Sequence, residues 1–286
     1  MSAPAALTLA RGAVREGVTA IENLAQLLRS RTVGPRQLGH ALPEMRLGCA
    51  SLATAIAELK EAMAEHLGSD PAGLASFLGM LTHASVRVDE LGAAIRNKES
   101  TPLDARERLA LEAIVRGIGG ELDSMLRLVD LVGVATTLRT ADIDLSALLA
   151  ERRRPSQRLT PVHAIIELRA PTFRADARVV LELLEFAVST VVRAGVESPR
   201  IVADLAVLPE QPLLITVGPA PARGGAAVSL KSTEDLKNIR ILDVSLRPEL
   251  PHEAEVVQAA ARFAGFSFKV ADDNKSVTIT SQAPIT

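Results

Sequence analysis

Tryptophan and tyrosine are absent from this chain of 286 residues, and phenylalanine occurs only six times. Sugar platforms, base-stacking surfaces and aromatic cages are built from exposed aromatic rings, so the composition disfavours these classes of site. Hydrophobic residues nevertheless make up 48% of the chain. The core must therefore be built from aliphatic side chains, mainly Leu, Val, Ile and Ala.

Cysteine, net charge and long apolar runs are also scarce. Cys49 is the only cysteine, which excludes an intramolecular disulfide; with no signal-peptide pattern, this favours a reducing compartment and a cytoplasmic location. The formal net charge is −2, so no overall positive field attracts nucleic acid. No apolar stretch reaches the length of a membrane span. The length leaves room for two globular domains.

The N-terminal half is dominated by apolar residues at alternating spacings of three and four. Such seams predict long helices that wind around one another in a left-handed bundle. Helices are expected over residues 1–31, from Pro35, from Pro71 with Asp70 as its N-cap, and after Pro102. The seam residues are Val14, Val18, Ile21 and Leu28; Leu42, Met45, Cys49, Leu52, Ile56, Leu59, Met63 and His66; Leu74, Leu78, Leu81, Ser85, Val88, Gly92 and Ile95; and Leu111, Val115, Ile118, Leu122, Met125, Val129 and Val132.

The seams are compatible with a bundle within one chain and with a bundle formed by two copies. A helical bundle within one chain would show them, but long two-helix hairpins cover their apolar faces best by pairing, so a homodimer is also expected.

The pattern changes after about residue 138. A short helix at residues 144–149 precedes the run Arg152-Arg153-Arg154, which is expected to be a linker. Period-two alternation then predicts strands, interrupted by helical stretches, which indicates an α/β sandwich with helices over one face of a mixed sheet. The strands are expected at 164–168, 213–217 and 277–280, and the helices at 176–194 and 252–264. The expected domains are an N-terminal helix at 1–33, a helical bundle at 34–140 and an α/β domain at 141–286.

Over roughly residues 72–283 this order resembles the cytoplasmic half of a two-component sensor histidine kinase. Residues 77–83 (FLGMLTH) look like the run that leads into the phosphorylated histidine of that family. The resemblance implies an antiparallel long-helix bundle for dimerisation and phosphotransfer, followed by a GHKL-type ATP-binding α/β sandwich. Further similar segments are 126–132 (LRLVDLV), 143–149 (IDLSALL) and 173–184 (FRADARVVLELL).

Three departures from the family pattern argue against nucleotide binding. Phe186 and Thr190 stand where the family has asparagines for ATP and Mg²⁺. Residues 217–221 (VGPAP) supply no carboxylate where the family holds adenine, and residues 250–253 (LPHE) replace a glycine-rich phosphate loop. We therefore expect no cofactor, and the resemblance extends to kinase-like histidine phosphotransferases or pseudokinases that have lost ATP binding.

Two histidines qualify as phospho-acceptors. His83 occupies an outward heptad position, 61 residues before Asp144, a separation that resembles the spacing of the family. His40 has the same outward position and is the weaker choice because its spacing fits less well. Where the family has an acid directly after the histidine, Ala84 follows His83, and the nearest acids along the chain are Asp89 and Glu90.

The other histidines and the glycines give no rival motif. His66 lies in line with a seam, and His163 and His252 stand at the starts of a strand and a helix. No pair has the spacing of a metal site, so no metal is expected. The glycines of residues 117–120 indicate close helix packing, and Gly224-Gly225 indicates a flexible loop.

Two functions follow. The chain would be a two-component signalling protein without ATP binding that docks response-regulator-type partners and relays phosphoryl groups through His83. Alternatively, it would be a dimeric adaptor or scaffold, a pseudokinase with no phosphoryl chemistry.

Overall fold

The computed structural model describes residues 3–30, 32–66, 70–98, 103–135, 137–151, 160–168, 172–205, 213–219, 239–244, 246 and 248–281. Two compact units make up the chain: Met1–Asp130 with Arg247–Val256, and Leu131–Leu246 with Val257–Thr286. The domain limits expected at residues 33 and 140 stay predictions. The arginine run at 152–154 and Gly224-Gly225 lie outside the described residues.

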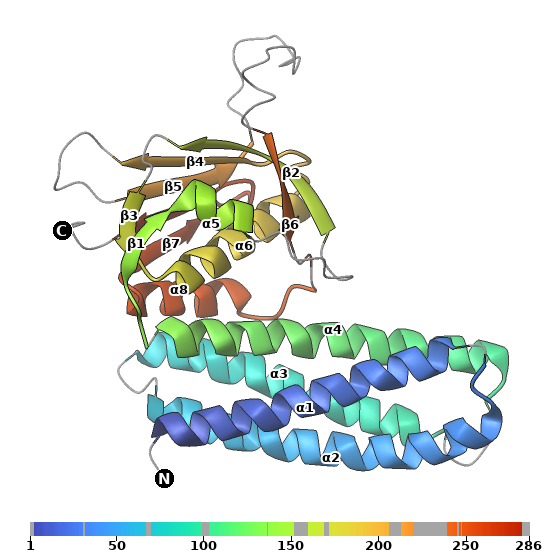
Figure 1. The fold of residues 1–286 in the computed structure, drawn as a ribbon. Coiled ribbons are helices and arrows are strands. Elements are labelled where there is room, and N and C mark those ends of the chain that lie inside the picture. The colour runs from blue at the N-terminus through green and yellow to red at the C-terminus, as the bar shows by residue number, and fades with distance from the viewer. Residues whose placement is uncertain are drawn as a thin grey trace. The chain divides into compact units, whose positions relative to one another are not determined.

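Four long helices, counted over the described residues, make up most of the first unit: α1 (Ala3–Arg29), α2 (Pro35–His66), α3 (Pro71–Arg96) and α4 (Ala105–Ala135) (Figure 1). Their starts follow the capping signals in the sequence. Pro35 is the first residue of α2, and the Asp70 side chain accepts a hydrogen bond from the Gly73 amide at the start of α3. A side-chain acceptor satisfies an amide that has no partner within the helix.

The four helices close into a bundle within a single chain. α1 packs on α2, and α2 packs on α3. Arg15 of α1 is hydrogen bonded to Asp130 of α4 at 2.7 Å, and Arg87 of α3 forms an ion pair with Glu121 of α4. Seams on α1, α2 and α4 are covered inside the chain, since their described side chains are all buried. The homodimer therefore stays a prediction that the seams do not require.

The buried side of α3 is wider than its predicted seam. Leu74, Leu78 and Ser85 are only half-buried, while five residues outside the seam are buried: Gly73, Phe77, Met80, Ala84 and Leu91. A helix in a closed bundle contacts two neighbours, so its apolar stripe is broader than a two-helix seam. The centre of the buried face of α3 is therefore rotated about the helix axis relative to the face that the heptad spacing predicted.

An α plus β fold is confirmed, with the strands in the second unit. In the described residues they form a mixed sheet in the order β6-β2-β4-β5-β8-β7, in which β2 and β4 are parallel, and a small antiparallel pair, β1 with β3. The strands are β1 (Ala141–Asp144), β2 (Thr160–Leu168), β3 (Thr172–Ala175), β4 (Arg200–Leu205), β5 (Leu213–Gly218), β6 (Ile239–Val244), β7 (Phe266–Val270) and β8 (Val277–Ser281).

Three shorter helices complete the described chain: α5 (Leu145–Glu151), α6 (Ala177–Arg193) and α8 (Glu253–Phe263). α6 packs on β5, β6 and β8, and Figure 1 shows it with α5 on one face of the sheet. The core between them is aliphatic, as the composition required, with Leu183, Val191 and Ile215 fully buried. None of the helices in the described ranges is long and apolar enough to cross a membrane.

α6 begins at a buried carboxylate. Asp176 is 3% exposed and accepts hydrogen bonds from the backbone amides of Arg139 at 2.7 Å and Arg178 at 3.0 Å. The Arg178 guanidinium donates a further bond of 2.7 Å. Burial opposes ionisation, but these bonds outweigh it and hold the pKa of Asp176 below its usual value. The carboxylate thus caps α6 and ties it to the segment that follows α4.

Candidate functional site

His83 lies in the middle of α3 on a side that is partly open to solvent. Its side chain is 34% exposed, between exposed Thr82 and buried Ala84. The ring therefore leans toward a neighbouring helix instead of pointing straight outward, as the heptad position had predicted. It remains reachable from solvent, and its backbone is held by a packed helix.

Glu121 of α4 faces this ring and also binds Arg87. Nε2 of His83 lies 3.3 Å from Oε2 of Glu121. The Arg87 guanidinium, one helical turn after His83, donates from Nε to Oε2 at 2.8 Å and from Nη2 to Oε1 at 3.1 Å. Arg87 also donates from Nη1 to Glu90. One carboxylate of α4 thus joins the two side chains of α3, forming a group of His83, Arg87 and Glu121.

All three side chains of this group are partly withdrawn from water. Arg87 is 29% exposed and Glu121 20%. The hydrogen bond to Glu121 raises the pKa of Arg87 above its usual value, with a smaller contribution from Glu90. A bidentate guanidinium–carboxylate pair has fixed geometry and is stronger than a simple ion pair. Glu121 is therefore held in place to receive the His83 ring.

The arrangement can prepare an imidazole for group transfer. When Nε2–H donates to the carboxylate of Glu121, the lone pair of the neutral ring is on Nδ1. A nucleophilic histidine needs such a lone pair on an accessible ring and a partner for its other nitrogen. The structure thus supplies a partner acid that the residue after His83 does not.

The sequence-based reasoning missed Glu121 because it searched along the chain. Glu90 contacts Arg87 but not the ring in any described bond, and the orienting acid comes from a different helix. No pattern along the sequence marks Glu121. Its position follows from the register of the hairpin, in which Lys98, just after α3, pairs with Glu107 of α4 at 2.6 Å. In an antiparallel hairpin with this register, the position of α4 opposite His83 is residue 122, next to Glu121.

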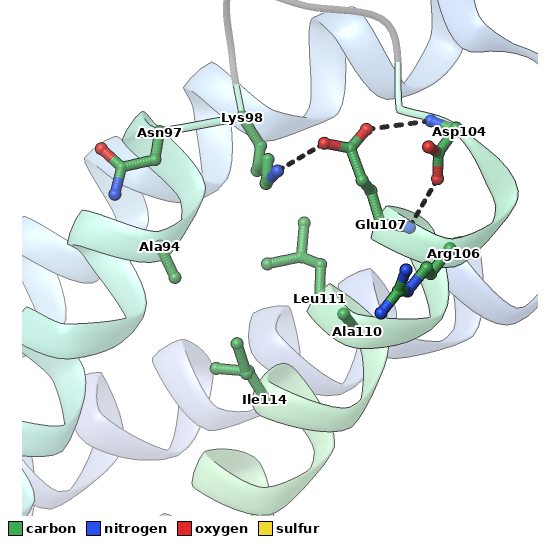
Figure 2. Close-up of a pocket in the computed structure, with 9 residues that line it drawn as sticks. All are labelled: Ala94, Asn97, Lys98, Asp104, Arg106, Glu107, Ala110, Leu111 and Ile114. Atoms are coloured by element: carbon green, nitrogen blue, oxygen red, sulfur yellow. Dashed lines mark hydrogen bonds and ion pairs between the residues drawn. The ribbon is translucent and has the colours of Figure 1, made fainter.

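A pocket of about 520 Å³ lies where α3 ends and α4 begins. Figure 2 shows apolar side chains on both helices, with the Lys98–Glu107 ion pair at one end. The backbone amides of Asp104 and Glu107 each donate to the side-chain carboxylate of the other residue, which caps α4. The hydrogen bond from Lys98 lowers the pKa of Glu107. The pocket is lined by Ala94, Asn97, Lys98, Asp104, Arg106, Glu107, Ala110, Leu111 and Ile114.

The other predicted histidines have no comparable setting in the described part of the chain. His40 is exposed near the start of α2. The side chains of His66 and His163 lie outside the described residues. His252 is exposed and has a backbone φ of 63°. Within the described ranges, no group of three or more His, Cys, Asp or Glu could hold a metal ion.

Residues at the positions that depart from the nucleotide-binding pattern pack in the core or form hydrogen bonds within the fold. Phe186 is 7% exposed in the core, and the Thr190 hydroxyl donates to the Phe186 carbonyl at 2.8 Å. The Leu250 amide donates to the Glu253 carboxylate at 3.1 Å at the start of α8. A carboxylate at this helix N-terminus would repel a bound anion. Val217 is buried, and residues 220 and 221 lie outside the described residues.

Comparison with known proteins gives a distant structural likeness. The chain is similar to the histidine kinase AdeS of Acinetobacter baumannii, with 14% identity and a TM-score of 0.34, over 72% of this chain and 95% of that one. No protein-family model matches the sequence, and no curated protein matches it either.

Proposed function

We propose that this chain is a cytoplasmic two-component signalling protein that docks response-regulator-type partners and relays phosphoryl groups through His83. The group of His83, Arg87 and Glu121 carries this proposal. It combines a half-exposed imidazole, a carboxylate 3.3 Å from one ring nitrogen and a guanidinium held beside them. A structural histidine on a solvent-facing helix would not need either charged partner.

The transfer step is simple in chemical terms. The lone pair of a His83 ring nitrogen attacks the phosphorus of an aspartyl phosphate on the receiver domain, so that an N–P bond forms. The bond between phosphorus and the aspartyl oxygen breaks, and the aspartate leaves as a carboxylate. The proton on the other ring nitrogen stays there, hydrogen bonded to Glu121.

The hairpin of α3 and α4 also offers a surface for the partner. Val86, three residues after His83, is 49% exposed, and Ile114 of α4 is 43% exposed. Ile114 lies in the wall of the pocket. Exposed apolar side chains on both helices of the hairpin suit a protein partner that presents apolar anchors.

The second unit is proposed to be a GHKL-type domain that has lost ATP binding and serves as a further contact surface. The position of Phe186 in the core of this unit supports this. Isothermal titration of the full chain with a non-hydrolysable ATP analogue and Mg²⁺ should give no heat of binding. Micromolar binding would show that the domain retains its nucleotide site.

The relay is tested by phosphotransfer from a radiolabelled phospho-receiver domain to the native chain, His83→Ala and His40→Ala. Native protein and His40→Ala should take up label to the same extent, and His83→Ala should take up none. His40 is a matched control because it is an exposed histidine on a neighbouring helix of the bundle. Label that survives in His83→Ala, or is missing from the native chain, would remove the relay.

The alternative is a dimeric adaptor without phosphoryl chemistry. The absence of an acid directly after His83 favours it. In that case the bundle would pair with a second copy, and the chain would bind its partner with equal affinity when His83 is replaced by alanine.

A further inference from the structure

Arg87 is shared between two carboxylates in the structure. It gives two hydrogen bonds to Glu121, at 2.8 and 3.1 Å, and a third to Glu90. Glu121 is also the acceptor that faces His83. Among these described side chains, one guanidinium is shared by two acids, so this group of three charged side chains is negative before any phosphoryl group is added.

A phosphoryl group on His83 would enter this negative environment. It brings about −1.5 to −2 charges and three strong acceptor oxygens. If the phosphoryl group is on Nε2, it takes the place of the Glu121 carboxylate. If it is on Nδ1, only the width of the imidazole ring separates it from that carboxylate. A planar guanidinium binds phosphate oxygens as well as it binds a carboxylate. The phosphoryl group and Glu121 therefore need the same donors of Arg87.

We infer that Glu121 competes with the phosphoryl group of phospho-His83 for Arg87, and that this competition keeps the phosphoryl group at a high transfer potential. In the resting state Arg87 is bound to Glu121. In the phosphorylated state it turns to the phosphoryl oxygens, so that Glu121 loses its guanidinium partner and lies beside a like charge. The loss of this ion pair disfavours retention of the group, so the chain passes it on instead of storing it. This inference rests on the proposed relay.

The competition can be measured without a protein partner. The full chain is loaded with phosphoramidate, excess free imidazole is added, and the distribution of phosphoryl groups between His83 and imidazole is read at equilibrium by ³¹P NMR. Free imidazole is the reference because it has the same chemistry without Glu121 or Arg87. Glu121→Gln keeps the shape and an acceptor oxygen but loses the charge, so it should shift the distribution toward His83 on the order of tenfold.

Matched variants separate this effect from a change in folding. Glu90→Gln removes the other carboxylate that binds Arg87. The Glu90 side chain is 52% exposed, so this variant should shift the distribution less than Glu121→Gln. Glu121→Asp keeps the charge on a shorter side chain and should shift the distribution less than Glu121→Gln, and Arg87→Gln should shift the distribution toward imidazole. Urea unfolding curves for each variant control for stability.

A failure of the proposed competition can be told apart from a failure of the proposed relay. Equal distributions for native protein and Glu121→Gln, an equal shift in Glu90→Gln, or no phosphorylation of His83 by phosphoramidate would each overturn the competition. If the native chain takes no label from a phospho-receiver but shows the Glu121 effect with imidazole, the competition stands and the relay fails.

Discussion

At the scale of single residues, Asp176 makes a testable contribution to stability. Its pKa is held below the usual value by the hydrogen bonds from Arg178 and Arg139, despite burial. Because the pKa is lowered by folding, the ionised carboxylate stabilises the fold above the unfolded-state pKa of about 4, and this contribution is lost as the pH falls through the folded-state pKa.

Asp176→Asn should therefore be less stable than the native chain by about 1–2 kcal/mol at pH 7, since the cap loses its charge. The difference should shrink as the pH is lowered and vanish in acid. Urea unfolding at a series of pH values measures it, with the exposed Asp272→Asn as the control. A difference that is the same at pH 7 and pH 3 would contradict the role of the charge.

The residue scale also shows where the sequence was sufficient and where it was not. Asp70 and Pro71 predicted the start of α3 because capping depends on neighbours in the chain. Glu121 was missed because its pairing with His83 depends on the register of two helices. That register is set by a turn and by side-chain packing, which single-residue patterns do not encode.

At the scale of elements, α1 contains two glycines with opposite surroundings. A Cβ added to Gly17 would lie 2.7 Å from Cδ1 and 3.1 Å from Cβ of Leu52, which is buried in α2. A Cβ added to Gly12 would meet nothing within 4 Å. Gly17 thus permits the close approach of α1 and α2, whereas Gly12 has no packing role.

Gly12→Ala should stabilise the chain by up to about 1 kcal/mol, because alanine favours the helix. Gly17→Ala gains the same propensity but overpacks the helix contact, which typically costs about 1–3 kcal/mol, so it should be destabilising. Urea unfolding of both variants measures the change in the free energy of unfolding, which should rise for Gly12→Ala and fall for Gly17→Ala. Stabilisation by both substitutions would show that α1 and α2 are not packed at Gly17.

The same scale explains which elements could be predicted. The long helices were predicted because their apolar period repeats many times, and β2, β5 and β8 because they alternate clearly. Five of the described strands were missed. β1 and β3 have only four residues each, and β4, β6 and β7 have five or six, so a period of two has few repeats in which to stand out. The buried side of α3 was misplaced because closure by two neighbouring helices widened it.

At the scale of the whole molecule, composition and order of elements predicted an α plus β chain with a helical bundle before the sheet. They could not predict that the bundle closes within one chain, because the same seams would serve a homodimer. Closure depends on contacts between distant residues, such as Arg15 with Asp130. The proposed function depends in the same way on a contact between α3 and α4.

The most direct test of the account is to locate the phosphoryl group on the native chain. The protein is incubated with a phosphorylated receiver domain, digested under conditions that preserve phosphohistidine, and analysed by tandem mass spectrometry. The proposal predicts a single phosphorylated site at His83. Modification at His40 or another residue, or an unmodified chain beside a receiver that has transferred its label elsewhere, would contradict it.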